Sequence, residues 1–334
     1  MRPILLCALI IAPCAFAVHA ARLQGSNSPQ PSNTKSLLTI ASNVRVRVEP
    51  GVNAGEAGRL PLGTIVRELE RTPDRVKIGA AEDYWYRVAA PGGVEGWVFG
   101  ALMTPFDSAR RAEIYARLAG ERLKLKGASF SDLTELMEFL DRAVKETAGR
   151  DRLAEFELLR LLALQKTLAS IPFEKREEAP YAPWIKAQGE SIVYSEPAGE
   201  WYVRSEQFWN LERKYHALPL AERIAWEASQ IPLPGECEGY LPCHLYYEAE
   251  TAGHYLKLYP RGAHTAQALD SISEMLAGVV EDLKGANHTY EVPKEDRATF
   301  HKQVTDLRAV LSRVTNAKAA RTVKQLDEIA RHFR

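Results

Sequence analysis

The segment VRVRVEPG at residues 44–51 decides how the first part of the chain is interpreted. Its three valines stand at alternate positions, separated by Arg45 and Arg47. A period of two places the valines on one face of an extended strand, toward a core, and the arginines on the other, toward solvent. The Pro-Gly pair that follows is typical of a turn. The segment therefore predicts a half-buried β-strand that ends near residue 48.

Further short strands follow at close spacing. They are predicted at residues 65–69, 76–78, 85–88 and 95–99. The stretches between them are rich in glycine and proline, which favour turns, as at residues 50–51 and 91–93. Several short strands joined by close turns are typical of a small β-barrel, which we expect over residues 37–105.

Three motifs occur in order along this barrel. They are VRVEP at 46–50 followed by Gly58 and Gly63-Thr64, YWYRV at 84–88, and GWV at 96–98 with Gly93 before it and Leu102 after it. Together they resemble the bacterial SH3-like family, in which a Val-Arg-Ser-Gly-Pro stretch, a Gly-Thr turn, a Trp-Tyr-Lys-Val strand and a closing Gly-x-x-Gly-Trp-Val pattern follow one another. Two positions depart from this pattern: Arg45 stands where the family commonly has Asn, and Val48-Glu49 stands where it commonly has Ser-Gly. These departures affect the expected geometry and polarity of the first loop and not the expected fold.

The aromatic residues of the barrel are the candidate ligand-binding residues. They are Tyr84, Trp85, Tyr86, Trp97 and Phe99. Successive side chains of a strand point to opposite faces, so some of these rings fill the core and others are free to line a groove. We expect Trp85 and Trp97 in the core, and Tyr84 and Tyr86 are the better candidates for exposed contacts. The family resemblance implies that such a groove binds a peptide or a cell-wall glycopeptide.

After Phe106 the apolar period changes from two to 3.6, which predicts helices. A helical bundle is expected over residues 106–172. Its third helix, at about 151–170, is leucine-rich on more than half of its surface and is therefore expected at the centre. The second helix is expected to lack a full capping box, because Ser131 is followed three residues later by Thr134.

Residues 173–334 predict a second helical region. Recurrent proline and glycine at 172–199 indicate an irregular connector, after which Trp201, Phe208, Leu211 and Tyr215 begin a helical stripe. Stripes at 245–259 and 269–283, joined by YPRGAH at 259–264, are similar to the helix pairs of tetratricopeptide-like envelope proteins. No period near 34 residues recurs, so a regular array is not supported. The fold class is thus a multi-domain β + α chain, and the helical region forms one domain or two.

The first 20 residues predict a secretory signal peptide. Arg2 precedes an apolar run at 4–18, and small residues at 18 and 20 favour cleavage before Ala21. Residues 21–36 are polar and proline-containing, as in a flexible linker. No other apolar stretch is long enough to span a membrane, so the mature chain is expected to have no transmembrane segment. We therefore expect an exported protein, in the periplasm or at the cell surface of a bacterium.

The signal peptide carries two of the four cysteines, and the mature chain keeps Cys237 and Cys243. In an oxidising compartment this pair predicts a disulfide, with two free thiols as the alternative. A catalytic Cys243 beside His244 is disfavoured, because adjacent helical residues do not face each other. No zinc-ligand spacing, phosphate loop or serine-nucleophile motif occurs. We therefore expect no catalytic residues, no metal and no cofactor.

Together these patterns favour a non-catalytic cell-envelope protein. Its SH3-like module would bind a peptide or cell-wall glycan ligand, and its helical region would act as a scaffold for a protein partner. The chain carries 43 basic and 43 acidic residues, so no global field favours nucleic acid as a partner. One alternative is a cell-wall hydrolase with an unrecognised site at 173–334. Another is a purely structural barrel whose groove is filled by the chain itself.

Overall fold

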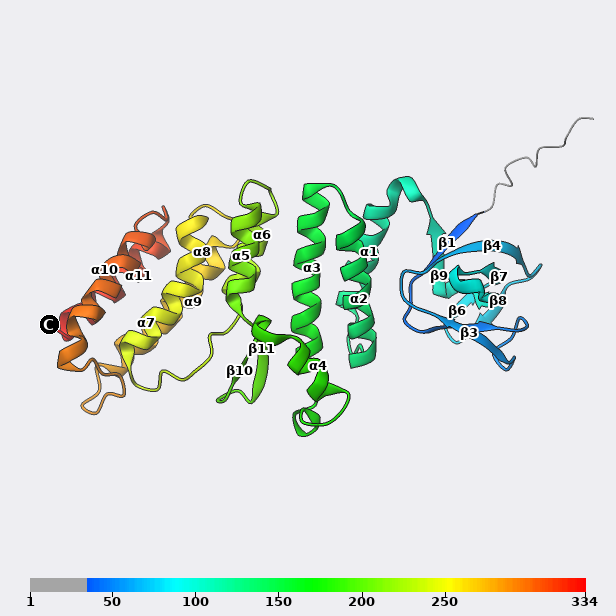
Figure 1. The fold of residues 1–334 in the computed structure, drawn as a ribbon. Helices are drawn as coiled ribbons and strands as arrows, with labels where there is room; N and C mark the ends of the chain where they lie inside the picture. Colours follow the sequence, from blue (N-terminus) through cyan, green and yellow to red (C-terminus); the bar gives the residue numbers. More distant parts are fainter. Residues whose placement is uncertain (1–34) are drawn as a thin grey trace, which may run out of the picture. The chain divides into compact units, whose positions relative to one another are not determined.

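The computed structural model describes residues 35–334. The predicted signal peptide and nearly all of the predicted linker lie outside these residues. Within them, a β-sheet region comes first and a mainly helical region follows, as the sequence predicts (Figure 1). Among residues 35–334, no helix has the length and apolar content needed to cross a membrane.

A seven-stranded antiparallel sheet forms the first region. In chain order its strands are β1 (Ser36–Thr39), β2 (Val44–Arg47), β3 (Glu56–Leu60), β4 (Ile65–Arg71), β7 (Trp85–Ala89), β8 (Glu95–Phe99) and β9 (Met103–Phe106). Their spatial order is β3-β2-β8-β7-β4-β1-β9. All seven strands contribute to one buried cluster: Leu37, Val44, Val46, Leu60, Val66, Val88, Val98 and Met103. A sheet whose strands all share one core must curl around it, which is the barrel that the alternation predicted.

Three details of the sheet differ from the sequence prediction. The first predicted strand ends at Arg47, where the register with β3 shifts, and Val48 is exposed instead of half-buried. The predicted strand at 76–78 exists as β5 (Val76–Ile78), but it pairs only with β6 (Ala81–Asp83) in a separate hairpin. Strands β1, β3 and β9 had not been predicted.

Three helices follow the barrel: α1 (Arg111–Lys124), α2 (Phe130–Glu146) and α3 (Arg150–Ala169). Helix α3 packs against α1, α2, α5 (Ser205–Tyr215) and β11 (Glu200–Val203), which confirms its expected central place. The expectation that α2 lacks a capping box is wrong. The helix begins at Phe130, one residue before Ser131, and Ser129 and Asp132 form a complete capping box in front of it.

The later region contains one short hairpin among its helices. Strand β10 (Ile192–Ser195) pairs with β11, so Trp201 lies in a strand, and the predicted stripe becomes helical only from Ser205. The remaining elements are α4 (Tyr181–Ala187), α6 (Ala221–Ser229), α7 (Leu241–Glu250), α8 (Ala252–Leu258), α9 (Thr265–Asp282), α10 (Arg297–Leu311) and α11 (Ala317–His332). The predicted helix at 245–259 is broken at Thr251, whose backbone is not helical (φ −109°, ψ −99°).

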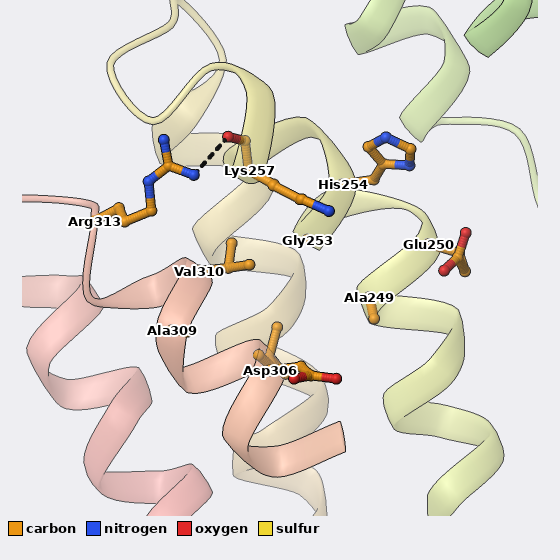
Figure 2. Close-up of a pocket in the computed structure, with 10 residues that line it drawn as sticks. Ala249, Glu250, Gly253, His254, Lys257, Asp306, Ala309, Val310 and Arg313 are labelled. Carbon is orange, nitrogen blue, oxygen red and sulfur yellow. Dashed lines mark hydrogen bonds between the residues drawn. The ribbon is translucent and has the colours of Figure 1, made fainter. Parts of the chain in front are cut away.

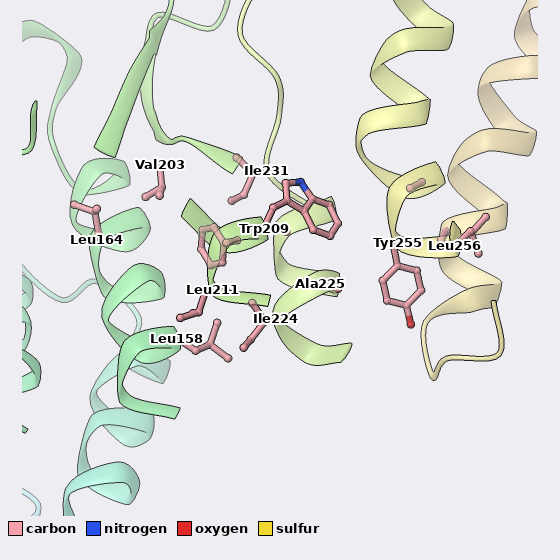
Figure 3. Close-up of a cluster of buried hydrophobic side chains, with 14 of the residues drawn as sticks. Leu158, Leu164, Val203, Trp209, Leu211, Ile224, Ala225, Ile231, Tyr255 and Leu256 are labelled. Carbon is pink, nitrogen blue, oxygen red and sulfur yellow. The ribbon is translucent and has the colours of Figure 1, made fainter. Parts of the chain in front are cut away.

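One cluster of buried apolar side chains extends through the helices, from Ile114 in α1 to Phe333. Figure 3 shows part of it, with Leu158 of α3, Trp209 of α5, Ile224 of α6 and Tyr255 of α8. The predicted disulfide between Cys237 and Cys243 is present. It closes the loop before α7, where Leu241 N–H donates to Glu291 O at 3.1 Å and Gly239 O accepts from Glu291 N–H at 2.9 Å.

Helix α2 holds the turn between β3 and β4. Glu135 Oε1 accepts the backbone N–H of Leu62, and a guanidinium nitrogen of Arg142 donates to the carbonyl oxygen of Leu62 at 2.8 Å. Phe139, between these two residues on the same helix face, packs its ring against Gly63. The side chain of Leu62 is buried in the helical cluster and not in the barrel's own. Helix α2 therefore satisfies both backbone polar groups of Leu62 and encloses its side chain.

Gly63 should be intolerant of any side chain. Its φ of +74° is costly for other residues, and an added Cβ would lie 2.3 Å from Cδ2 of Phe139. Gly79 is a matched control, because its φ is +61° but nothing lies within 4 Å of an added Cβ. We expect Gly79→Ala to lower the free energy of unfolding by about 1 kcal/mol. Gly63→Ala should lower it by about 2 kcal/mol more, through the clash with Phe139. Equal losses in urea unfolding would contradict this packing.

Candidate functional site

The five predicted aromatic residues divide into a buried pair and three half-exposed rings. Trp85 and Phe99 are 4% and 7% exposed, lie opposite each other on β7 and β8, and have ring centroids 5.7 Å apart. Neither ring belongs to the barrel's interior cluster, so Trp85 is buried as expected but in a separate pair. Both are therefore poorly placed to contact a ligand.

Trp97 is half-buried, so its expected place in the core is wrong. On β8 the neighbouring Val98 points into the barrel's cluster, and alternation turns Trp97 to the opposite face. There it stands opposite Arg47 on β2 and Arg87 on β7. Arg87 is itself paired with Glu70 at 3.2 Å and Glu95 at 2.5 Å. Trp97 thus lies among charged residues, and the positive charge of Arg87 is neutralised by its two glutamate partners.

The two tyrosines are half-buried like Trp97, and Tyr86 packs against the barrel's interior cluster. Tyr84 lies between β6 and β7, and its ring meets that of Tyr86 edge-on at 6.3 Å between centroids. Two exposed guanidinium groups stack on Tyr84: Cζ of Arg71 is 4.6 Å from the ring centroid, and that of Arg75 is 5.3 Å away. Neither arginine has a carboxylate partner within 4 Å among the described residues. We call Arg71, Arg75, Tyr84 and Tyr86 the Tyr–Arg cluster.

The backbone around Tyr84 is fixed from two sides. Its N–H donates to Oδ1 of Asp83 at 2.8 Å, and its carbonyl oxygen accepts from Gly100 N–H at 2.8 Å. A Cβ on Gly100 would lie 2.6 Å from both the Asp83 carboxyl carbon and the Tyr86 ring. Because Gly100 has no side chain, Asp83 and Tyr86 can pack against its backbone. The two hydrogen bonds and this packing fix the position of Tyr84 in the Tyr–Arg cluster.

The chemistry of this cluster is recognition. A guanidinium offers a planar set of N–H donors that matches a carboxylate or phosphate, and a tyrosine ring offers a face for stacking. Arg71 and Arg75 were not predicted from the sequence. Their only sequence signal is a pair of arginines around the turn residues Thr72-Pro73-Asp74, which is too common to identify a site.

The residues considered for catalysis or metal binding do not form such a site in the described part of the chain. Cys243 is bonded to Cys237 and so offers no thiolate, and Nε2 of His244 lies 2.7 Å from the carbonyl oxygen of Glu238. Within residues 35–334, no group of three or more His, Cys, Asp or Glu side chains is arranged to hold a metal ion.

Comparison with known proteins identifies the barrel. Residues 42–104 match the family model described as bacterial SH3 domain. The matched residues fall inside the barrel predicted at 37–105 and confirm that resemblance. No curated protein and no solved structure gave a match to the chain. The similarity of the later helices to tetratricopeptide-like proteins stays a prediction.

The two tryptophans should differ in what they contribute to stability. We expect Trp85→Ala to lower the free energy of unfolding by about 3–5 kcal/mol, because it removes a fully packed ring and leaves a cavity beside Phe99. Trp97→Ala should cost only about 1 kcal/mol, because the ring is already half in water. Urea unfolding of both variants measures the difference. A loss for Trp97→Ala as large as that for Trp85→Ala would place Trp97 in the core.

Proposed function

We propose that this protein is an exported, non-catalytic cell-envelope protein whose bacterial SH3 domain binds a peptide or glycan ligand of the cell wall. The observation that carries the proposal is the Tyr–Arg cluster. It combines a half-exposed aromatic face with two guanidinium groups that have no carboxylate partner in the described part of the chain. A cell-wall peptide brings carboxylate groups, and its glycan brings sugar faces that stack on aromatic rings.

The place of the cluster in the barrel supports this proposal. The contacts of the barrel with α2 run through Leu62, Gly63 and Asn43, and none of them involves Arg71, Arg75 or Tyr84. The chain can therefore bind its own helices at one part of the barrel and a ligand at another. This favours a binding role over the reading in which the groove is filled by the chain itself.

The helical region would then serve as the scaffold that presents the barrel and meets a protein partner. Its exposed aromatic residues support this role, because aromatic side chains are enriched in protein interfaces. Phe173 is 57% exposed and Tyr246 is 50% exposed. The proposal of a non-catalytic role rests on the bonded state of Cys243, which removes the nucleophile that a papain-like wall peptidase would need.

Retention on purified peptidoglycan sacculi tests the binding role. We expect the protein to co-sediment with sacculi, and the double variant Arg71→Gln/Arg75→Gln and the single variant Tyr84→Ala each to lower the apparent affinity about tenfold. Tyr246→Ala is the control, since it removes an exposed tyrosine from the helical region. Retention that is absent, or that is unchanged in the cluster variants, rules out this site for wall binding.

Fractionation of a bacterium that expresses the full chain tests export. We expect the protein outside the cytoplasm, with Ala21 as its first residue and with Cys237 and Cys243 protected from thiol-alkylating reagents until a reductant is added. The disulfide supports this expectation, because such bonds persist in oxidising compartments. A protein that stays in the cytoplasm with an intact N-terminus would contradict export.

A further inference from the structure

A cleft of about 520 Å³ lies between the pair α7–α8 and helix α10 (Figure 2). Its floor and walls carry small or apolar side chains, which leave the space open. They are Ala249, Gly253, Leu307, Ala309 and Val310. Gly253 leaves no room for a side chain, because an added Cβ would lie 2.8 Å from the carbonyl oxygen of Glu248. The volume is in the range typical of small-ligand sites.

The charged residues of this cleft are two of each sign. Glu250 comes seven residues before Lys257 on one wall, and Asp306 comes seven residues before Arg313 on the other. Arg313 donates to the backbone carbonyl oxygen of Lys257 at 3.2 Å, which holds its guanidinium beside the backbone of that residue. Figure 2 shows them at the upper end of the view, with Asp306 at the lower end and Glu250 on the right. We call this site the dipolar cleft.

Most of these charges have no ion-pair partner. Glu250, Lys257 and Arg313 make no ion pair within 4 Å anywhere in residues 35–334. Asp306 pairs with Lys302 at 2.6 Å, but the two side chains are 62% and 77% exposed, and an exposed pair of this kind contributes little. Arg313 uses only one of its five N–H donors on Lys257. Both ends of the cleft are therefore free to bind a ligand of opposite charge.

His254 adds a fixed polar group to the wall. Its ring stacks on Trp209, with centroids 4.1 Å apart and an angle of 12° between the planes. Burial lowers the pKa of His254, so the imidazole is neutral at neutral pH. Its nitrogens have no hydrogen-bond partner among the described residues, and a neutral imidazole offers one donor and one acceptor. The stack holds these groups in place before any ligand binds.

We propose that the dipolar cleft binds short peptides with a free amino and a free carboxyl terminus. Asp306 lies in α10 and Arg313 lies two residues beyond the end of that helix, so seven residues at about 1.5 Å each separate the two by about 10 Å. An extended peptide covers about 3.4 Å per residue, so three residues match this span. The carboxylate would lie by Lys257 and Arg313, and the ammonium group by Glu250 and Asp306. The small side chains of the floor leave room for the peptide backbone, and this site is separate from the barrel.

Calorimetric titration of the mature protein with alanine peptides tests this proposal. We expect trialanine to bind more tightly than dialanine. Amidation of its carboxyl terminus or acetylation of its amino terminus should each raise the Kd about tenfold. In Lys257→Gln and Arg313→Gln the affinity should fall, and amidation should no longer matter. Glu250→Gln should in turn remove the effect of acetylation.

Two further variants distinguish binding in the cleft from a non-specific effect of protein charge on peptide affinity. Ala309→Leu fills the exposed wall without changing a charge, and it should abolish binding. Lys324→Gln, on the exposed face of α11 outside the cleft, should bind trialanine like the wild type. Circular dichroism confirms that each variant is folded. Absent heat at millimolar trialanine, equal affinity for blocked and free peptides, or an equal loss in Lys324→Gln would each overturn the proposal.

Discussion

Leu62 presents its backbone N–H and carbonyl oxygen to one helix, and the arrangement of the described chain depends on this contact. Glu135 and Arg142 lie seven residues apart on α2, so both reach the same turn from one helix face. A buried backbone group without a partner is costly, and here both groups of Leu62 are satisfied by charged side chains. The barrel is thus joined to the helices by directed hydrogen bonds as well as by apolar packing.

Acidic and basic residues are equal in number over the whole chain, but some charged side chains have no ion-pair partner in the described residues. The 43 basic and 43 acidic residues cancel in number. Many of them form exposed pairs, such as Arg59 with Glu56, which add little to stability. The charges without partners are more informative. Arg71 and Arg75 stack on Tyr84, and the dipolar cleft is lined by two acidic and two basic residues. A zero net charge therefore says little about which ligands the surface recognises.

Much of the fold could be predicted from the sequence, because alternation and helical periodicity record which face of an element is buried. The strand at 85–88 and the central helix near 151–170 are examples. Strand β3 escaped prediction because it lies in one of the glycine-containing stretches that favour turns, although Val94 packs where a side chain at Gly58 would be. The hairpin of β10 and β11 escaped because Trp201 is at helical spacing from Phe208.

The candidate sites were predicted less completely, for a related reason. Tyr84 and Tyr86 stood out as aromatic residues, but the arginines that complete their cluster are brought close by tertiary pairing. Arg71 stands opposite Tyr86 where β4 pairs with β7, and Arg75 directly precedes the β5–β6 hairpin. The spacing of seven between acidic and basic residues is visible at Glu250 and at Asp306. That the two helices face each other across a cleft depends on tertiary packing, which one sequence does not record.

The disulfide has a consequence for α7 that goes beyond redox chemistry. It closes the loop at 237–243, and this loop pairs through Gly239 and Leu241 with Glu291, in the segment that leads to α10. Helices α7 and α10 carry facing walls of the dipolar cleft. Oxidation therefore restricts the relative motion of these walls while the protein matures. A ligand that arrives later has less conformational freedom to remove, and preorganisation of this kind favours tighter binding.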